Sequence, residues 1–310
     1  MGIPARLAAI TMHPIKQHSL QAIGLMLLAV FMMSTMDVGL KMLVENYGSM
    51  QVVFFRCALS MPVFFVWMAM TDRSLFRTAY LGGHVLRGLL GLAMLYAVGE
   101  CFRVMQLADA YAIFFAAPLL VTLMSGPMLG EPAGLMRTLA ALAGFAGVLI
   151  VLQPSGSGWN GYGAAMALLA TLFYALSIIL LRKLGSADRT LTIAFWFVFL
   201  VGVGAGLAAL PNWQPVNWSR DWHWILIMGL SGTLGQVLLT AAFRRASAAI
   251  VAPFDYVHLV WAVVYGWWFW SYLPDSRTWL GSAVIIASGL FVLYREHRAH
   301  REAVRLSVGD

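Results

Sequence analysis

Residues 88–103 read GLLGLAMLYAVGECFR and residues 229–244 read GLSGTLGQVLLTAAFR, so Gly-Leu-x-Gly and Phe-Arg recur 141 positions later. At the same offset Leu27-Leu28-Ala29 recurs as Leu168-Leu169-Ala170, and Lys41 aligns with Arg182. With one residue inserted, Gly147-Val148-Leu149 aligns with Gly289-Leu290-Phe291. One offset shared by several apolar segments predicts that the chain contains two copies of one unit.

The apolar residues occur in long blocks. The chain has 310 residues, of which 61% are hydrophobic and 11% charged, with a mean hydropathy of +0.80. A soluble domain carries about 25% charged residues, whereas blocks of about 20 apolar residues cross a hydrocarbon core about 30 Å thick. We therefore predict an all-α integral membrane protein with ten transmembrane helices. Their expected positions are 20–42, 50–70, 82–103, 108–129, 135–152, 161–182, 190–210, 222–242, 247–270 and 277–294.

The repeat divides these helices into two sets of five. An odd number of spans reverses the direction of the second copy, which gives two inverted five-helix repeats. Inverted repeats are common in carriers that bind solute near the midplane between the halves. The predicted organisation is a cytoplasmic tail at 1–19, a first repeat at 20–152, an outer loop at 153–160, a second repeat at 161–294 and a cytoplasmic tail at 295–310.

Positive charge predicts the orientation. With a cytoplasmic N-terminus, fourteen Lys and Arg residues fall on the cytoplasmic side and four on the outer side. This asymmetry follows the positive-inside rule and predicts that both termini are cytoplasmic. The cytoplasmic set is Arg6, Lys16, Arg73, Arg77, Arg137, Arg182, Lys183, Arg189, Arg244, Arg245, Arg295, Arg298, Arg301 and Arg305, and the outer set is Lys41, Arg103, Arg220 and Arg277.

Composition and motifs exclude several classes of function. The net charge of +7 is spread over the loops, which argues against a nucleic-acid surface. Cys57 and Cys101 both fall in apolar spans, which is typical of packed thiols rather than of a disulfide or metal set. The sequence holds no phosphate-binding glycine loop, His-Glu-x-x-His or Gly-x-Ser-x-Gly. We therefore expect no enzyme activity, no metal and no cofactor, and a transport step that is driven by a gradient.

Several motifs carry a resemblance to a known family. They are Phe54-Phe55-Arg56, Leu86-Arg87-Gly88-Leu89-Leu90-Gly91, the stretch 246–256 that reads ASAAIVAPFDY, and the helix that holds Gly281 and Gly289. These motifs resemble the drug/metabolite transporter superfamily, specifically its EamA-like ten-span proteins. Within it the chain is similar to bacterial amino-acid exporters, including those for aromatic amino acids, and to S-adenosylmethionine carriers. The resemblance implies amino-acid-like solutes and the bacterial inner membrane.

The chain departs from the family pattern at one position. Such proteins often carry Gly-Glu after the fourth and the ninth spans. Here Gly130-Glu131 keeps this pair, but the second half reads Ser271-Tyr272. Any role of the glutamate is therefore not duplicated.

Asp255 and His258 are the first candidates for a solute site. They lie three residues apart on one face of the ninth span, roughly 12 and 17 Å inside it. Pro253 removes a backbone hydrogen bond just before them and should loosen the helix. A carboxylate at this depth is costly unless it meets a partner or a solute. Either the pair binds solute or a proton, or it is a static contact between helices.

A second group of charged residues is expected in the outer third of the spans. Asp37 and Lys41 share a face of the first span, Arg56 lies near the start of the second, and Glu100 and Arg103 end the third. This group is either an outer gate that closes by ion pairing or a static salt-bridge network.

Aromatic residues at plausible cavity depth are candidate cavity walls, because aromatic faces bind cations and flat rings accept varied side chains. For any single one of them, packing between helices is the favoured interpretation. Gln236 is a further candidate for the solute site, because an amide in lipid needs partners. Pro118 and Pro253 are both candidate hinges. The aromatic candidates are Tyr96, Tyr111, Phe115, Tyr174, Trp196, Tyr256 and Trp261.

The sequence therefore predicts a secondary transporter that exports amino acids across the inner membrane by alternating access between the two halves. The alternative is uptake or exchange of S-adenosylmethionine or a related metabolite. From a different class, a lipid scramblase would need a polar groove open to lipid, and a structural membrane subunit is a further alternative. The expected partners are a small-molecule solute and the lipid bilayer, with no nucleic acid.

Overall fold

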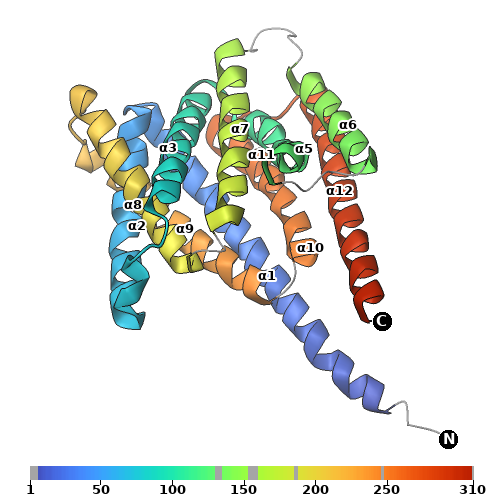
Figure 1. Cartoon of the computed structure of the whole chain (residues 1–310). Helices are drawn as coiled ribbons and strands as arrows, with labels where there is room; N and C mark the ends of the chain where they lie inside the picture. The colour runs from blue at the N-terminus through green and yellow to red at the C-terminus, as the bar shows by residue number, and fades with distance from the viewer. Residues whose placement is uncertain (1–5, 130–134, 153–159, 185–187, 246–247, 309–310) are drawn as a thin grey trace, which may run out of the picture.

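The computed structural model describes residues 6–129, 135–152, 160–184, 188–245 and 248–308, with side chains except at 6–19, 126, 129, 137, 182, 190, 248–249, 252 and 296–308. Over these ranges the chain is helical, without strands (Figure 1). The elements are α1 (Arg6–Val44), α2 (Ser49–Thr71), η1 (Arg73–Phe76), α3 (Leu81–Val104), α4 (Leu107–Phe114), α5 (Ala117–Leu129), α6 (Leu135–Leu152), α7 (Gly161–Leu184), α8 (Thr190–Ala209), η2 (Leu210–Asn212), α9 (Trp218–Arg245), α10 (Ala248–Val251), η3 (Ala252–Tyr256), α11 (Val257–Trp270) and α12 (Ser276–Val308).

The expected membrane architecture is confirmed, with differences at the fourth, fifth and ninth spans. Eight helical segments of the described chain are long and apolar enough to cross a membrane. The fifth span, α6, has a shorter apolar helix at Thr138–Leu152. The ninth, expected as one helix over 247–270, is divided into α10, η3 and α11. The division has a local cause, since Pro253 cannot donate the backbone hydrogen bond that a continuous helix needs there.

The expected tails are partly helical. α1 begins at Arg6 and α12 ends at Val308, so both helices continue past the spans expected for them. Of the expected outer loop at 153–160, only Asn160 belongs to the described residues, and the Gly130-Glu131 pair lies outside them. α1 begins and α12 ends at the same, lower end of the bundle in Figure 1.

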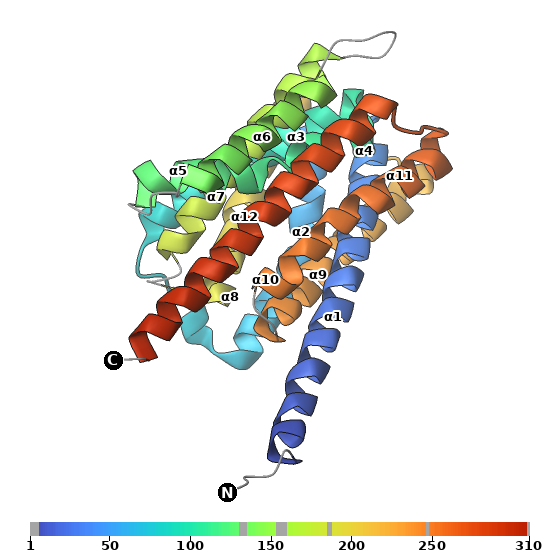
Figure 2. The ribbon, with the colours of Figure 1, turned by 90° about the vertical axis from the view of Figure 1, so that its right-hand side faces the viewer.

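The packing of the helices is preserved when the two halves are exchanged. α1 packs along α9 and α3 packs along α7, and these two pairs are equivalent once the halves are swapped. α2 packs on α8, and α6 packs on α12. The members of each pair hold the same place in their repeats, so exchanging the halves leaves both pairs unchanged. Figures 1 and 2 show α6 and α12 side by side at one edge of the bundle. This symmetry is the arrangement of two inverted five-helix repeats.

Gly88 on α3 and Gly229 on α9 give the closest match between the repeats. A side chain on Gly88 would begin 2.8 Å from the Cβ of Leu200, and one on Gly229 would begin 2.5 Å from the Cβ of Leu59. Leu59 and Leu200 are also 141 residues apart. The same close approach of two helices is therefore built twice, and the lack of a side chain at each glycine permits it.

The fourth helix of each repeat is broken near its middle. In the first repeat α4 ends at Phe114 and α5 begins at Ala117, with Pro118 in the first turn of α5. In the second repeat Pro253 lies at the start of the 3₁₀ segment η3, between α10 and α11. A proline is tolerated in a first turn because its missing N–H would have no helical partner there. Both breaks fall near the middle of a span, where carriers of inverted-repeat architecture bind solute.

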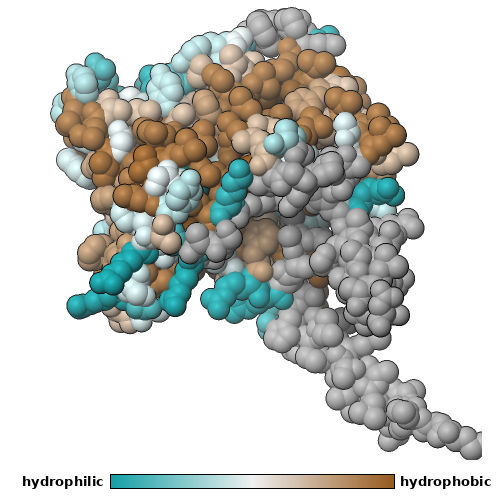
Figure 3. All heavy atoms as spheres, viewed as in Figure 1, coloured by the Kyte–Doolittle hydropathy of each residue, from teal (hydrophilic) through white to brown (hydrophobic). Residues whose placement is uncertain are grey.

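The surface is that of a membrane protein. Figure 3 shows apolar residues over most of one face and hydrophilic side chains gathered along its lower edge, with a recess in the surface above that edge. The lower edge lies at the end of the bundle where α1 begins and α12 ends.

Candidate transport site

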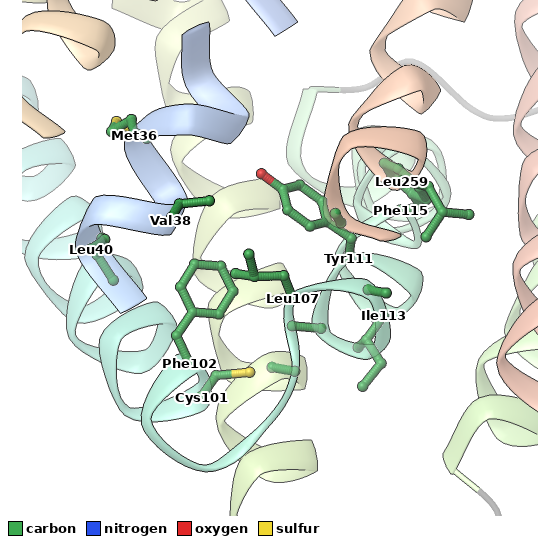
Figure 4. Packing of buried hydrophobic residues seen from close by; sticks show 14 of the residues in the cluster. Met36, Val38, Leu40, Cys101, Phe102, Leu107, Tyr111, Ile113, Phe115 and Leu259 are labelled. Carbon is green, nitrogen blue, oxygen red and sulfur yellow. The ribbon is translucent and has the colours of Figure 1, made fainter. Parts of the chain in front are cut away.

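Tyr111, Asp37 and His258 meet beside the two helix breaks. The Tyr111 hydroxyl on α4 donates a hydrogen bond to the Asp37 carboxylate on α1. The His258 ring on α11 stacks on the Tyr111 ring, with centroids 5.1 Å apart and planes 16° apart. Figure 4 shows Tyr111 pointing from α4 toward α1. Asp37 is only 9% exposed, so the contact joins a buried carboxylate to side chains from both repeats.

Asp255 and His258, expected to act together, lie in contact. His258 Nε2 is 3.6 Å from Asp255 Oδ1, and His258 Nδ1 is 2.8 Å from Ser34 Oγ. The side chain of His258 is buried, whereas that of Asp255 is 56% exposed. Ser34 therefore fixes the imidazole, and the carboxylate keeps room for another partner. We call Ser34, Asp37, Tyr111, Asp255 and His258 the mid-span cluster.

Asp255 lies near tyrosines of both halves. Its carboxylate lies within electrostatic range of Tyr111 on α4, Tyr174 on α7 and the neighbouring Tyr256. Tyr174 is 45% exposed and lies within range of Arg87 on α3 as well. Side chains from α3, α4, α7 and η3 therefore lie near one another between the halves, and those of Tyr174 and Asp255 keep accessible surface. A polar solute would find both charge and aromatic surface there.

Lys41 binds backbone oxygens rather than a carboxylate. Its Nζ donates to the carbonyl oxygens of Phe102 at 2.6 Å and Met105 at 2.8 Å, and it lies 5.3 Å from the Trp270 ring centroid. Asp37, on the same helix face, binds Tyr111 instead. Lys41 therefore satisfies carbonyl groups at the C-terminal end of α3 and ties that end to α1.

The other three expected gate residues lie near these contacts without forming one ionic network. Glu100 and Arg103 are 3.4 Å apart on α3, and Ser49 donates to Glu100 at 2.6 Å. Arg103 donates to the Tyr47 carbonyl at 3.1 Å. Arg56 lies within electrostatic range of Asp37. The outer third of the bundle is thus held by hydrogen bonds more than by ion pairs.

Further hydrogen bonds join the two halves at the end of the bundle away from the start of α1. Tyr47 donates to Asp221 at 2.6 Å, and Asp109 accepts from Tyr272 at 2.6 Å and from Thr278 at 2.9 Å. Burial, together with the Asp109 carboxylate, raises the pKa of Tyr272, which keeps its hydroxyl protonated as a donor. These hydrogen bonds join the repeats at the end of the bundle that the charge pattern predicts to be outer.

The remaining candidates occupy different positions. The Tyr96 hydroxyl lies within electrostatic range of Tyr162, the second residue of α7. Trp261 packs edge-on against Phe31 with centroids 4.7 Å apart, as a packing residue does. Gln236 on α9 is exposed. The structure thus brings Asp255, His258, Tyr174 and Tyr256 together, and it does not bring Tyr96, Trp261 or Gln236 to them.

Tyr256 is wedged between two elements. Its ring packs edge-on against Phe115 with centroids 5.0 Å apart, and its buried hydroxyl has no hydrogen-bond partner among the described residues. The hydroxyl lies against Gly289 of α12, where a side chain would collide with it. Gly289 therefore permits the position of Tyr256.

A His–Asp pair lies at the opposite end of the bundle, which the charge pattern predicts to be the inner end. His84 Nε2 is 2.8 Å from Asp188 Oδ2, and Asp188 also accepts from the Thr78 hydroxyl at 2.6 Å and the Ala79 amide at 3.1 Å. Burial alone would raise the pKa of Asp188, but the hydrogen bonds from Thr78, His84 and Ala79 outweigh it and lower the pKa below its usual value. This pair fixes the start of α3 to the segment before α8.

The two halves each match the same family model. The EamA-like transporter family matches residues 20–153 and again residues 161–294. The chain belongs to the EamA-like transporter family. It is therefore a multi-pass membrane transporter of the drug/metabolite transporter superfamily.

Curated bacterial relatives of this EamA-like protein carry several solutes. It is 31% identical to a riboflavin transporter of Vibrio cholerae over 74% of this chain and 77% of that protein. It is 30% identical to the pseudopaline exporter CntI of Pseudomonas aeruginosa over 85% and 93%, and 27% identical to an S-adenosylmethionine uptake transporter of Rickettsia bellii over 89% and 94%. These relatives are transporters rather than enzymes. Their named solutes do not include amino acids.

One crystal structure is similar in fold. Its sequence is 16% identical, and it superposes with a TM-score of 0.60 over 90% of this chain and 98% of that one. At this identity the likeness concerns the fold alone.

Sequence reasoning missed several residues of the site. Ser34, which binds His258, gave no signal because serine is common in spans. Asp109 and Asp221 could have been found as carboxylates at the starts of apolar spans, and each binds a residue of the other half. Arg87 was visible as a charge at the edge of a span and was not assigned to the site.

Proposed function

We propose that this EamA-like transporter exports amino acids, aromatic ones among them, as a secondary carrier without catalytic activity. The observation that carries the proposal is the mid-span cluster, which lies beside the broken helix of each repeat. Carriers of inverted-repeat architecture bind solute at such breaks. The cluster and its neighbours offer a carboxylate to an amine and aromatic faces to a side chain.

Alternating access follows from the same arrangement. The bonds of Tyr47 and Asp109 to the second half hold the outer end closed, which supports access from the inner end in this conformation. Export would proceed as the outer contacts open and the inner ends come together. The positive charge of the inner loops supports a bacterial inner-membrane location with both termini in the cytoplasm.

A second candidate is uptake or exchange of S-adenosylmethionine. The similarity to an S-adenosylmethionine uptake transporter over most of both chains favours it. That solute is cationic, so the accessible Asp255 carboxylate would serve either candidate. Saturable binding of one adenosyl compound distinguishes this candidate from a broad amino-acid exporter.

Counterflow into proteoliposomes tests both candidates. The panel contains labelled amino acids, including phenylalanine, together with S-adenosylmethionine and riboflavin. Asp255→Asn and His258→Ala are compared with the wild type from pH 5.5 to 8, and Asp72→Asn in the exposed inner loop is the matched control. We expect uptake of several amino acids that depends on pH, with a loss of about tenfold or more in Asp255→Asn, because a charged hydrogen-bond partner is removed.

Three outcomes would change the assignment. Movement of S-adenosylmethionine alone transfers the protein to the second candidate. Equal activity of Asp255→Asn and the wild type removes the mid-span cluster from the mechanism. Movement of none of the panel overturns the amino-acid assignment and leaves the family unchanged.

A further inference from the structure

Polar contacts join α1 of the first half to α11 of the second half. The two helices pack on each other (Figure 2). Ser34 Oγ on α1 lies 2.8 Å from His258 Nδ1 on α11, beside the break in the ninth span. Thr35 Oγ1 lies 2.7 Å from the hydroxyl oxygen of Tyr265, one to two helical turns further along α11. Both contacts are hydrogen bonds between side chains of different repeats.

A third polar contact lies where both helices end. α1 ends at Val44 and α11 ends at Trp270. Lys41 Nζ lies 5.3 Å from the Trp270 ring centroid, and the Trp270 indole N–H donates to Glu45 at 3.4 Å. The polar contacts therefore run from the middle of the bundle to one of its ends. We call the following residues the polar seam: Ser34, Thr35, Lys41, His258, Tyr265 and Trp270.

The 141-residue offset relates the polar seam to the contact between α5 and α7. In the repeats α7 corresponds to α1 and α5 corresponds to α11, and α5 packs on α7 as α11 packs on α1. Ala117, where α5 begins, corresponds to His258, one residue after the start of α11. Leu184, where α7 ends, corresponds to Leu43, one residue before the end of α1. The two contacts therefore have the same register in their repeats.

The matching positions on α5 and α7 are apolar, except for Arg182, which matches Lys41. The hydroxyls of Thr122 and Ser125 on α5 donate to carbonyl oxygens of their own helix, at 2.9 and 2.6 Å. The hydrogen bonds of the polar seam therefore have no counterpart at these positions. In the order Ser34, Thr35, His258, Tyr265 and Trp270, the matching residues are Ala175, Leu176, Ala117, Met124 and Leu129.

This difference between the halves makes the two access states unequal. In a carrier built from inverted repeats, the two states are related by exchanging the halves, so a contact that is closed at one end corresponds to an open one at the other. Identical halves would give both states the same free energy. Opening the polar seam gives up hydrogen bonds between protein groups, whereas opening the matching contact between α5 and α7 gives up none of these.

We propose that the transporter opens along the polar seam at the end of the bundle that the charge pattern predicts to be outer, and that the hydrogen bonds of the seam hold this end closed when no solute is bound. Hydroxyl, imidazole and indole groups can exchange a protein partner for water as the seam opens. The seam is therefore a gate that opens to water at a modest cost. This gate goes beyond the proposed function, because it is the same for each candidate solute.

Two spin labels measure the width of the seam. They are attached at Asn46→Cys, just past α1, and Leu273→Cys, just past α11, which are both exposed positions. Cys57→Ala and Cys101→Ala remove the two native thiols. Double electron–electron resonance in lipid nanodiscs then gives the distribution of distances between the labels without any solute.

Tyr265→Phe and Ser34→Ala each remove one hydrogen bond of the seam. The Thr35 hydroxyl donates to the Phe31 carbonyl at 2.8 Å, so Tyr265 is the donor in its bond with Thr35. Thr35 therefore keeps one partner in Tyr265→Phe. Tyr162→Phe is the matched control, because it removes a hydroxyl that bonds to α3 outside the seam.

The labelled protein should show a main short distance and a minor longer one. Each seam variant should raise the ratio of the long to the short population about fivefold, the change expected for one net hydrogen bond, and the double variant should raise it further. Tyr162→Phe should leave the ratio unchanged. Melting temperature in detergent shows that each variant is folded, and Tyr265→Phe alone decides if Ser34→Ala does not fold.

The outcomes separate the gate from the proposed function. A distribution that neither seam variant changes, or that Tyr162→Phe changes equally, overturns the polar seam as the gate and leaves amino-acid export in place. Because the measurement uses no solute, a failure of amino-acid counterflow overturns the proposed function without affecting the gate.

Discussion

The Tyr111 hydroxyl donates its hydrogen to the carboxylate of Asp37, and both residues are buried where α4 ends and α1 passes. The ring that carries this hydroxyl also receives the stacked imidazole of His258 from the second repeat. A single tyrosine therefore connects a buried acid of one half to the broken helix of the other. Its hydroxyl and its ring can be tested separately.

Tyr111→Phe should lower stability while keeping the stacked ring. The substitution leaves Asp37 without the hydrogen bond, and a buried acceptor without its donor costs about 1–3 kcal/mol. Thermal unfolding in detergent measures the change. Tyr162→Phe, whose hydroxyl donates to Glu100 at an exposed site, is the matched control and should shift the melting temperature less. Equal shifts for the two variants would contradict the special role of the Tyr111 bond.

Gly88→Ala and Gly229→Ala should destabilise the protein to a similar extent. Each new methyl group would begin within 2.8 Å of a leucine Cβ on the neighbouring helix, and overpacking of this kind costs about 1–3 kcal/mol. Gly24→Ala is the control, because no atom lies within 4 Å of its missing side chain. It should be neutral or stabilising by up to about 1 kcal/mol, the helix preference of alanine. A destabilised Gly24→Ala, or only one sensitive repeat position, would refute the matched packing.

Lys41→Met should loosen the outer end. It removes the donor to the Phe102 and Met105 carbonyls, and the loss of about 1 kcal/mol or more makes opening about fivefold more frequent. The native, fully buried Cys101 nearby reports the opening through its labelling rate with a membrane-impermeant maleimide, in a Cys57→Ala background. Arg277→Gln in the exposed outer segment is the control. Unchanged Cys101 labelling in Lys41→Met would exclude Lys41 from the closure.

Asp188 should make the inner end sensitive to acid. Its pKa is lower in the folded state than its usual value of about 3.9, so its contribution is complete above that value and is lost as pH falls through the folded pKa. We expect the melting temperature of the wild type to fall more steeply than that of Asp188→Asn between pH 5 and pH 3. Asp72→Asn, at an exposed carboxylate, is compared in parallel. Parallel curves for the wild type and Asp188→Asn would contradict the assigned hydrogen bonds.

The sequence by itself determined the class and the symmetry of this protein. Apolar blocks of membrane-spanning length leave the backbone no alternative to helices in lipid. The 141-residue offset that aligns Gly88 with Gly229 also relates Leu59 to Leu200, which the structure brings against them. Pro253 likewise marks a position where a continuous helix is disfavoured, because that effect is local. Proline alone does not decide where a helix breaks, since Pro62 lies inside the unbroken α2.

Only the tertiary structure decided which polar residues meet. Asp37 and Lys41 share a helix face in the sequence, yet Asp37 binds Tyr111 and Lys41 binds the end of α3. Ser34, Arg87 and Tyr174 acquire their significance from partners more than 80 residues away. Helical periodicity states which side of one helix a residue occupies. It does not state which other helix faces that side, because the depth and rotation of each helix are set by packing between helices.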